Sequence, residues 1–372
     1  MAKIVFIGAI PTSITTFRRN LIIKLVNEGH NVIAMAGETN EIEVKQIQSL
    51  GIQYIPYPIT RNRVNPLKDC ITFLHLFKSL NSIKPDIVFS YTIKPIIFGS
   101  FAITRKNNIK YIALIEGLGY GFQGKSFLRK ILKLIIIFCY RFSLKDSFKI
   151  IFLNKSNRKV FIDRKIVNKN KCELINGIGI DLNKFKYTDL KYGAPIFLLI
   201  SRLLKEKGII EYVKAAKIVL KIYPDTIFQL IGDIDFSHDR IDLKDVLNWD
   251  KEGSIEYYNY VQDVRPFLIN SHIYTLPSYH EGMSTTIMEA MSIGRPILTT
   301  NVPGCKETVV NGKNGFTIPP KNYQALANKM FWFIENRNKW EEMGKFSRKL
   351  AERNFNVNII NSKLLEIMQL DK

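Results

Sequence analysis

Cysteine and long apolar runs are both scarce in this sequence. Its 372 residues include four cysteines: Cys70, Cys139, Cys172 and Cys305. Their spacing fits neither a disulfide framework nor a metal site, which favours a reduced, cytoplasmic environment. In the most apolar helical segment, the uninterrupted run from Leu134 to Tyr140 is far shorter than the ~20 residues that span a bilayer. We therefore expect no membrane-spanning helix at this segment.

Histidine is also too sparse to indicate a metal site. The five histidines are His30, His75, His238, His272 and His280. None has a partner at metal-ligand spacing, so we expect no metal and no other cofactor. His280 stands beside Glu281, but a lone histidine near a site is more often a structural hydrogen-bonding group. We assign it no role.

Acidic residues are few in the first half of the chain. The net charge is +21, and residues 1–190 contain 30 Lys and Arg against 12 Asp and Glu, whereas the remainder contains 24 against 21. Such a basic surface attracts nucleic acid, anionic lipid or an anionic acceptor. The basic residues are dispersed and carry no signature of RNA or DNA binding, so we expect no nucleic acid partner.

Alternating strand and helix patterns predict two α/β domains with parallel sheets. The chain opens directly on an apolar strand pattern, so we expect no secretory signal. Strands are predicted at residues 4–7, 31–35, 86–90, 111–115 and 150–153, with helices such as 16–27 and 67–83 between them. The pattern starts again after the polar stretch 181–193, and a chain of 372 residues exceeds what one core usually supports. We predict domains 1–188 and 189–354, with the last segment, about 355–372, returning to the first domain.

Two glutamates eight positions apart form the most informative pattern. Glu281 follows a predicted buried strand at 273–278, and Glu289 lies in the helix that Ser284 or Thr285 would cap. In an open α/β sheet, this loop lies at the carboxyl end of a strand, where ligands bind, and the N–H groups at the start of the helix suit a phosphate. For two isolated glutamates, a solvated loop acid and a solvated helix acid remain the simpler interpretation.

A second loop favours the functional interpretation. The apolar run 195–200 predicts a strand that is buried on both faces, and Arg202 and Lys207 follow it. An arginine fork and a lysine point charge in that loop can bind a diphosphate. A basic loop taken alone is usually solvated. Here both loops follow strands of what we expect to be one sheet.

Several motifs, in order, resemble the retaining GT-B glycosyltransferases of family 4. The matching segments are Ser201-Arg202-Leu203 with Lys207-Gly208, Val261-Gln262-Asp263-Val264, Pro277-Ser278 with Glu281-Gly282, Glu289-Ala290-Met291, Gly294-Arg295-Pro296, and Gly304 with Glu307. This resemblance implies two Rossmann-like domains facing across a cleft and a UDP-sugar in the C-terminal one. It implies that Glu281 binds the donor sugar, that Glu289 binds the ribose, and that Arg202 and Lys207 neutralise the leaving diphosphate without a metal. The donor-binding set it implies also includes Val261, Gly282, Met283, Ser284 and Thr285.

Three further segments narrow the resemblance to a subgroup. The segments Ser90-Tyr91-Thr92-Ile93-Lys94-Pro95 with Gly99, Glu116-Gly117-Leu118-Gly119-Tyr120-Gly121-Phe122, and Val302 to Thr308 are similar to bacterial enzymes that extend sugars on polyprenyl diphosphate. These include lipid-linked α-1,3-N-acetylgalactosaminyltransferases and O-antigen or capsule transferases. The resemblance implies an acceptor loop at Glu116, Gly117 and Gly119, although a glycine-rich loop alone is more often a turn. Many members of the wider family have a histidine here, and this chain has Glu116 before Gly117.

One basic segment suits a membrane surface. Residues 125–142 interleave four cations, Arg129, Lys130, Lys133 and Arg141, with large apolar side chains. This pattern is typical of a helix lying in a bilayer interface, with cations at anionic head groups. An ordinary core helix with a basic exposed face explains the pattern about equally well. The charge of the first half favours the membrane.

Taken together, the sequence predicts a retaining, metal-independent hexosyltransferase of bacterial polysaccharide or O-antigen assembly. We expect it to move an N-acetylhexosamine, such as GalNAc, from a UDP-sugar to a polyprenyl-diphosphate-linked glycan. We expect it on the inner, cytoplasmic face of the plasma membrane, bound to anionic lipid. A UDP-sugar epimerase of the same fold, a transferase for soluble or lipopolysaccharide-core acceptors, and a non-catalytic scaffold remain alternatives.

Overall fold

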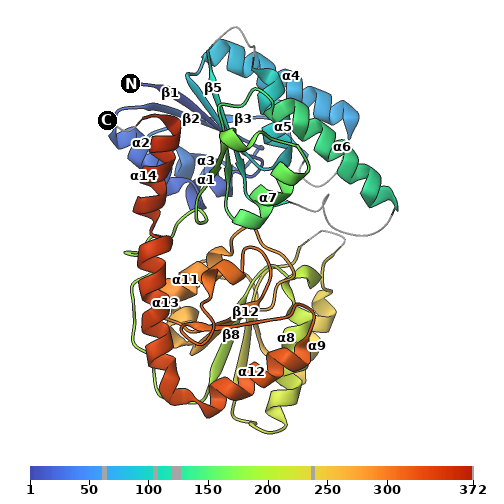
Figure 1. Cartoon of the computed structure of the whole chain (residues 1–372), viewed down its shortest axis with the longest axis vertical. Helices are drawn as coiled ribbons and strands as arrows, with labels where there is room; N and C mark the ends of the chain where they lie inside the picture. The colour runs from blue at the N-terminus through green and yellow to red at the C-terminus, as the bar shows by residue number, and fades with distance from the viewer. Residues whose placement is uncertain (61–64, 104–107, 119–126, 236–238, 371–372) are drawn as a thin grey trace. The chain divides into compact units, whose positions relative to one another are not determined.

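The chain folds into two compact units with a parallel sheet in each. The computed structural model describes residues 1–60, 65–103, 108–118, 127–235 and 239–370. Residues 1–175 and 360–372 make up unit 1, and residues 176–359 make up unit 2. Figure 1 shows the strands and helices of each unit.

The polar stretch that we expected to mark the domain boundary lies inside unit 2. Ile180 and Phe185 are buried, and the Thr188 N–H donates to the carbonyl of Ile293 at 3.0 Å. These apolar side chains anchor an otherwise polar segment. The division therefore falls between Ile175 and Asn176, before the expected boundary at 188/189.

Seven parallel strands form the sheet of unit 1, in the order β3-β2-β1-β4-β5-β6-β7. The strands are β1 (Lys3–Ile7), β2 (Asn31–Ala36), β3 (Gln53–Pro56), β4 (Ile87–Tyr91), β5 (Lys110–Ile115), β6 (Lys149–Phe152) and β7 (Cys172–Leu174). Chain order reverses at β1, which pairs with β2 on one side and β4 on the other. In open α/β sheets, ligands bind at the carboxyl ends of strands beside such a reversal.

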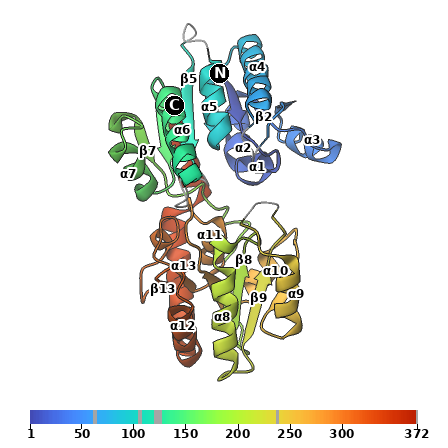
Figure 2. The same ribbon diagram turned by 90° about the vertical axis from the view of Figure 1, so that its right-hand side faces the viewer.

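The helices of unit 1 connect these strands. They are α1 (Thr12–Thr16), α2 (Arg19–Asn27), α3 (Glu41–Gln48), α4 (Pro66–Ile83), α5 (Ile93–Ala102), α6 (Phe127–Leu144) and α7 (Lys155–Asp163), with the 3-10 turn Lys169–Lys171 before β7. Asn65 caps α4 by accepting a hydrogen bond from the Lys68 N–H, and Pro66 occupies the first turn, where its missing N–H costs nothing. Figures 1 and 2 both show α4, α5 and α6 side by side, with α5 in the middle.

One predicted helix of unit 1 begins later than expected. The segment 16–27 was expected to be continuous, but α1 ends at Thr16 and α2 begins at Arg19. The N–H groups of Phe17 and Arg18 both turn back to the carbonyl of Ser13, which closes the first helix. The Arg18 side chain is buried in the resulting bend.

Six parallel strands form the sheet of unit 2, in the order β10-β9-β8-β11-β12-β13. They are β8 (Ile196–Ile200), β9 (Ile227–Ile231), β10 (Glu256–Tyr258), β11 (Ile273–Leu276), β12 (Ile297–Thr300) and β13 (Gly315–Ile318). Here the order reverses at β8, which pairs with β9 and β11. The predicted strands at 195–200 and 273–278 correspond to β8 and β11, so their loops do share one sheet edge.

The helices of unit 2 are α8 (Ile209–Leu220), α9 (Leu243–Lys251), α10 (Arg265–Asn270), α11 (Thr285–Ile293), α12 (Tyr323–Glu335), α13 (Trp340–Asn354) and the start of α14 (Val357–Met368), with 3-10 turns at Lys205–Lys207, Lys306–Thr308 and Arg337–Lys339. The chain passes from unit 2 into unit 1 within α14, between Ile359 and Ile360. In unit 1, Lys24 donates to Ser362, and Lys110 donates to Gln369.

The predicted fold class is confirmed: the protein is α/β, with two Rossmann-like parallel sheets. The strands of both sheets are largely buried apolar runs, as expected of parallel strands that helices cover on both faces. Within the described part of the chain, no helix combines the length and apolarity needed to cross a membrane.

Candidate functional site

Three loops meet at the carboxyl edge of the unit 2 sheet, beside the reversal at β8. They follow β8, β9 and β11. Gly208, at φ +74°, lets the first and third loops approach, because a Cβ there would stand 2.0 Å from the carbonyl oxygen of Pro277. The sheet thus brings together side chains that the sequence separates by more than seventy positions.

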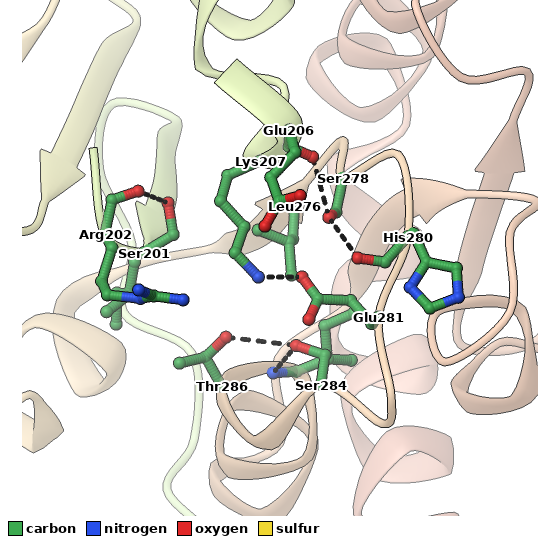
Figure 3. Close-up of polar contacts among 12 residues, drawn as sticks. Ser201, Arg202, Glu206, Lys207, Leu276, Ser278, His280, Glu281, Ser284 and Thr286 are labelled. Carbon is green, nitrogen blue, oxygen red and sulfur yellow. Dashed lines mark hydrogen bonds and ion pairs between the residues drawn. The ribbon is translucent and has the colours of Figure 1, made fainter. Parts of the chain in front are cut away.

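Lys207 and Glu281 form an ion pair at the centre of this edge. The Lys207 Nζ donates to Glu281 Oε1 at 2.6 Å, and the two side chains are 15% and 13% exposed. Figure 3 shows the two side chains pointing toward each other from their separate loops. In such a mostly buried place, each charge depends on the other, because removing one partner leaves the second uncompensated.

Arg202 lies apart from that pair. Its guanidinium is ion-paired with Asp235, in the loop after β9, and its side chain is 49% exposed. Figure 3 shows Arg202 on the far side of Lys207 from His280.

The sequence reasoning missed Asp235. Its place just beyond the apolar run 227–231 was a usable signal, since the next strand of the sheet ends there.

The loop that carries Glu281 is fixed by backbone hydrogen bonds. The Glu281 N–H donates to Pro303 O, and the Ser284 N–H donates to Gly304 O, both at 3.1 Å. Gly304, at φ +82°, permits this approach, because a Cβ there would stand 2.5 Å from the Glu281 carbonyl oxygen. The loop after β12 therefore supports the first glutamate.

The start of α11 lies next in the same loop. Ser284 caps the helix, with its Oγ accepting from the Ile287 N–H, and Thr285 is the first helical residue. Gly282 and Met283 lie between Glu281 and this cap, and the Met283 side chain is 8% exposed. Since the Ser284 amide already donates to Gly304 O, it is less suited to a phosphate than the sequence suggested.

Glu289 occupies a different environment from Glu281. It lies inside α11 and is partly buried, and its carboxylate has no hydrogen bond or ion pair among the described residues. Burial raises its pKa from 4.5 to about 7, which Lys184 partly offsets and Asp263 reinforces. A carboxylate in this state is ready to accept hydrogen bonds from hydroxyl groups.

Both glutamates act on one buried hydroxyl. Burial raises the pKa of Tyr274, on β11, and the charges of Glu289 and Glu281 raise it further. The Tyr274 hydroxyl donates to the Ile200 carbonyl at 3.2 Å. This hydrogen bond ties β11 to β8.

The other unit 2 residues considered from the sequence lie around the Lys207–Glu281 pair rather than in it. Val261 is in the loop between β10 and α10 and is partly exposed. The His280 ring is drawn to the side of the Lys207–Glu281 pair in Figure 3, and burial lowers its pKa. Burial also raises the pKa of Glu206, whose carbonyl accepts from Ser278 and from the Tyr279 N–H.

Among the described residues, no group of three or more His, Cys, Asp or Glu could hold a metal ion.

In unit 1, the predicted acceptor loop begins directly after β5. Glu116 is ion-paired with Arg18, which the sequence reasoning did not single out. Gly117 follows and is described, whereas Gly119, together with residues 120–126 of the predicted loop and basic segment, lies outside the described residues.

Comparisons with known proteins agree with this architecture. A family model described as "Glycosyl transferases group 1" matches residues 182–350, and one described as "Glycosyl transferase 4-like" matches residues 3–154. The chain is 27% identical over 378 residues to the N,N'-diacetylbacillosaminyl-diphospho-undecaprenol alpha-1,3-N-acetylgalactosaminyltransferase of Campylobacter jejuni, covering 98% of each chain. It is 26% identical over 318 residues to the UDP-Gal:alpha-D-GlcNAc-diphosphoundecaprenol alpha-1,3-galactosyltransferase of Escherichia coli, covering 82% of this chain and 80% of that one.

Solved structures share the fold over nearly the full length. A glycosyltransferase from Rickettsia africae superposes with a TM-score of 0.79 at 19% identity, over 99% of this chain and 98% of that one. The Anabaena protein Alr3699/HepE, in complex with UDP and glucose, superposes with a TM-score of 0.80 at 16% identity, over 99% of this chain and all (100%) of that one. At these identities, the likeness shows the fold, which is that of GT-B glycosyltransferases.

Proposed function

Because the chain belongs to the GT-B glycosyltransferases, with a 4-like half and a group 1 half, we propose that it is a hexosyltransferase that uses a UDP-sugar. The observation that carries this proposal is the Lys207–Glu281 ion pair beside the start of α11. A diphosphate that enters this edge competes with Glu281 for the lysine. Lys207 then binds the phosphate oxygens, and Glu281 becomes available for the hydroxyls of the donor sugar.

Arg202 and Glu289 complete the donor site in this proposal. Arg202 is half-exposed and paired with Asp235, so its guanidinium can turn to the diphosphate at small cost. The Glu289 carboxylate takes the ribose hydroxyls. In many enzymes, positive groups that are already positioned where negative charge develops in the transition state make the largest contribution to catalysis. Lys207 and Arg202 supply that charge, and we propose that the reaction needs no metal ion.

We propose transfer with retention of configuration. The bond between the sugar C1 and the diphosphate oxygen breaks, and the bond from C1 to the acceptor oxygen forms on the same face. The acceptor hydroxyl's proton passes to the departing diphosphate oxygen. In this scheme no protein carboxylate has to act as a nucleophile at the spacing that retaining glycosidases use.

The proposed acceptor is a saccharide on polyprenyl diphosphate, and the proposed donor sugar is an N-acetylhexosamine such as GalNAc. The printed names of the Campylobacter and Escherichia relatives, which specify undecaprenyl-linked acceptors, support the first part. The donors in those names differ, so the support for N-acetylgalactosamine comes from the Campylobacter protein alone. Polysaccharide biosynthesis, with O-antigen assembly as one form of it, is the corresponding cellular process.

A face of unit 1 suits the membrane on which such an acceptor resides. Helix α6 exposes a row of apolar side chains: Ile131 40%, Leu134 66%, Ile135 54%, Phe138 60% and Phe142 55%. Helix α4, on the other side of α5, exposes a second row: Leu67 80%, Ile71 55%, Leu74 47% and Phe77 37%. Exposed cations accompany both rows: Lys68, Lys78, Lys130, Arg141 and Lys145. We propose that this face binds the anionic, cytoplasmic surface of the plasma membrane.

A donor panel tests the proposed function. Purified protein is incubated with a polyprenyl-diphosphate-linked saccharide and each common UDP-sugar, with and without EDTA, and both UDP release and glycolipid mass are recorded. We expect one UDP-sugar to add one sugar to the glycolipid, unaffected by EDTA, with an α-linkage by NMR from an α-linked donor. UDP release without a larger glycolipid, or an epimerised UDP-sugar without acceptor, would contradict the proposal.

A further inference from the structure

A second polar cluster lies at the carboxyl edge of the unit 1 sheet, beside the reversal at β1. We propose that Arg18 in this cluster is a positioning residue, which holds the Glu116 carboxylate to accept a hydrogen bond from a hydroxyl of the acceptor saccharide. This inference rests on the proposed function, because it assigns a residue to the acceptor of that reaction. It concerns only side chains of unit 1.

Arg18 is buried and held on several sides. Its residue is 3% exposed, and its Nη2 donates to Glu116 Oε1. Its guanidinium lies over the Tyr91 ring, 4.5 Å from the centroid, and the Tyr91 hydroxyl is 2.9 Å from Ser13 Oγ. These contacts come from the end of β4 and from the segments after β1 and β5. A buried arginine with this many partners is fixed in one orientation.

The cluster also contains buried unpaired polar atoms and a strained backbone, both of which lower the stability of the fold. Arg18 Nε and Thr92 Oγ1 are buried without a hydrogen-bond partner among the described residues. Thr92, directly after β4, has φ 67° and ψ 155°, a region that is nearly restricted to glycine and is costly for a β-branched side chain. Strain and unpaired polar atoms concentrate at functional sites.

Another ion pair in unit 1 shows what an ordinary structural pair looks like. Lys149 and Glu173 join β6 and β7 at 2.5 Å, with side chains 28% and 32% exposed. Glu116 is equally exposed, at 31%, but its partner Arg18 is 4% exposed. Arg18 is therefore withdrawn behind the carboxylate of Glu116, and that carboxylate is the part of the pair that meets solvent.

This geometry selects a neutral ligand with hydroxyl groups. Arg18 is covered, so it cannot reach a phosphate, and the negative Glu116 in front of it repels one. Glu116 Oε2 has no hydrogen-bond partner in the described part of the chain, and a carboxylate oxygen can only accept. A sugar hydroxyl donates to such an oxygen, and the charge-assisted hydrogen bond from Arg18 Nη2 to the other oxygen, Oε1, holds the carboxylate in place.

The test compares Glu116→Gln with Glu173→Gln, a substitution of the same kind at an ion-paired glutamate that is equally exposed. In the lipid-linked transfer assay, we expect Glu116→Gln to raise the acceptor KM or lower kcat/KM for the acceptor about tenfold to hundredfold, as losing a hydrogen bond to a charged group implies. The Kd for UDP, measured by calorimetry, stays unchanged. Glu173→Gln should leave both values within about twofold of wild type, since exposed ion pairs contribute little.

Arg18→Lys separates positioning from charge. A lysine keeps the positive charge and loses the planar fork, so we expect a smaller loss of acceptor kcat/KM than in Glu116→Gln, with UDP binding intact. If Arg18→Lys fails to fold, Glu116→Gln alone decides. Wild-type transfer with unchanged acceptor kinetics in Glu116→Gln would overturn this inference and leave the proposed function standing. Absence of wild-type transfer would count against the proposed function instead.

Discussion

The two sheets place similar polar groups at equivalent positions but hold them differently. Each sheet reverses its strand order once, and each has a glutamate–cation pair at the carboxyl edge beside that reversal. In unit 1, the cation is almost fully buried and its glutamate is 31% exposed. In unit 2, Lys207 and Glu281 are covered to nearly the same degree. The first pair presents a fixed carboxylate, and the second presents two charges that a ligand can separate.

Surface character differs between the units as well. Unit 1 contains 30 Lys and Arg against 12 Asp and Glu, and unit 2 contains 24 against 21. Unit 1 also exposes the apolar rows of α4 and α6. This contrast is consistent with the proposal that unit 2 binds the nucleotide and that unit 1 binds the acceptor saccharide near an anionic membrane surface.

The largest expected effect comes from breaking the pair in unit 2. Lys207→Ala should lower kcat by about 100-fold, the magnitude typical for losing one preorganised electrostatic contact. The matched control is Lys217→Ala, whose partner Glu252 is 2.7 Å away with side chains 44% and 55% exposed. The control should keep kcat within about twofold. Turnover of Lys207→Ala near the wild-type value would remove Lys207 from the site.

A smaller effect is expected at the apolar face of unit 1. Phe138→Ser removes a side chain that is 60% exposed on α6, and should weaken binding to anionic vesicles by about tenfold, since burying a large apolar side chain contributes about 1.5–3 kcal/mol. Ile222→Ser in unit 2, where the side chain is 62% exposed, is the control and should bind as wild type does. Vesicle sedimentation measures both. Equal binding of the two variants would argue that unit 1 has no special membrane face.

The smallest expected effect is the titration of Glu289. Its pKa of about 7 in the folded protein exceeds its ordinary value of 4.5, so between these pH values the folded state binds more protons than the unfolded state. The free energy of unfolding should therefore fall as pH rises from about 4.5 to 7, by about 1 kcal/mol, which is less than the full shift implies because the side chain is only partly buried and water screens its charge. Glu289→Gln should flatten this pH dependence, as denaturant titrations at several pH values would show.

UDP binding offers an independent measurement of the protonation of Glu289. Ribose hydroxyls that donate to the Glu289 carboxylate favour its charged form, so UDP binding at pH 7 should release a fraction of a proton. Calorimetry in two buffers with different ionisation enthalpies measures that release. Glu289→Gln should bind UDP without it, and an identical release from this variant would exclude Glu289 as the source.

Much of the fold and part of the site could be predicted from the sequence. Apolar runs bounded by turns located the predicted strands to within one or two residues, because parallel strands covered on both faces leave a strong signal. The short strands β3 and β7 were not predicted. The loops with Lys207, Glu281 and Glu289 were identified for the same reason, since each follows or enters an element with a clear pattern. The helix predicted at 16–27 extends only from Arg19 to Asn27, because periodicity does not register the backbone hydrogen bonds to Ser13 that close α1 just before it.

By itself, the sequence determined the fold class, the repetition of the α/β pattern and the loops that carry charged side chains, because local apolar periodicity and chain order are sufficient for these. Only the tertiary structure decided the partners: Lys207 with Glu281, Arg202 with Asp235, and Arg18 with Glu116. Strand order within a sheet brings together residues that are 74, 33 and 98 positions apart. The burial that makes Arg18 a fixed support and shifts Glu289 arises from packing, which no linear pattern contains.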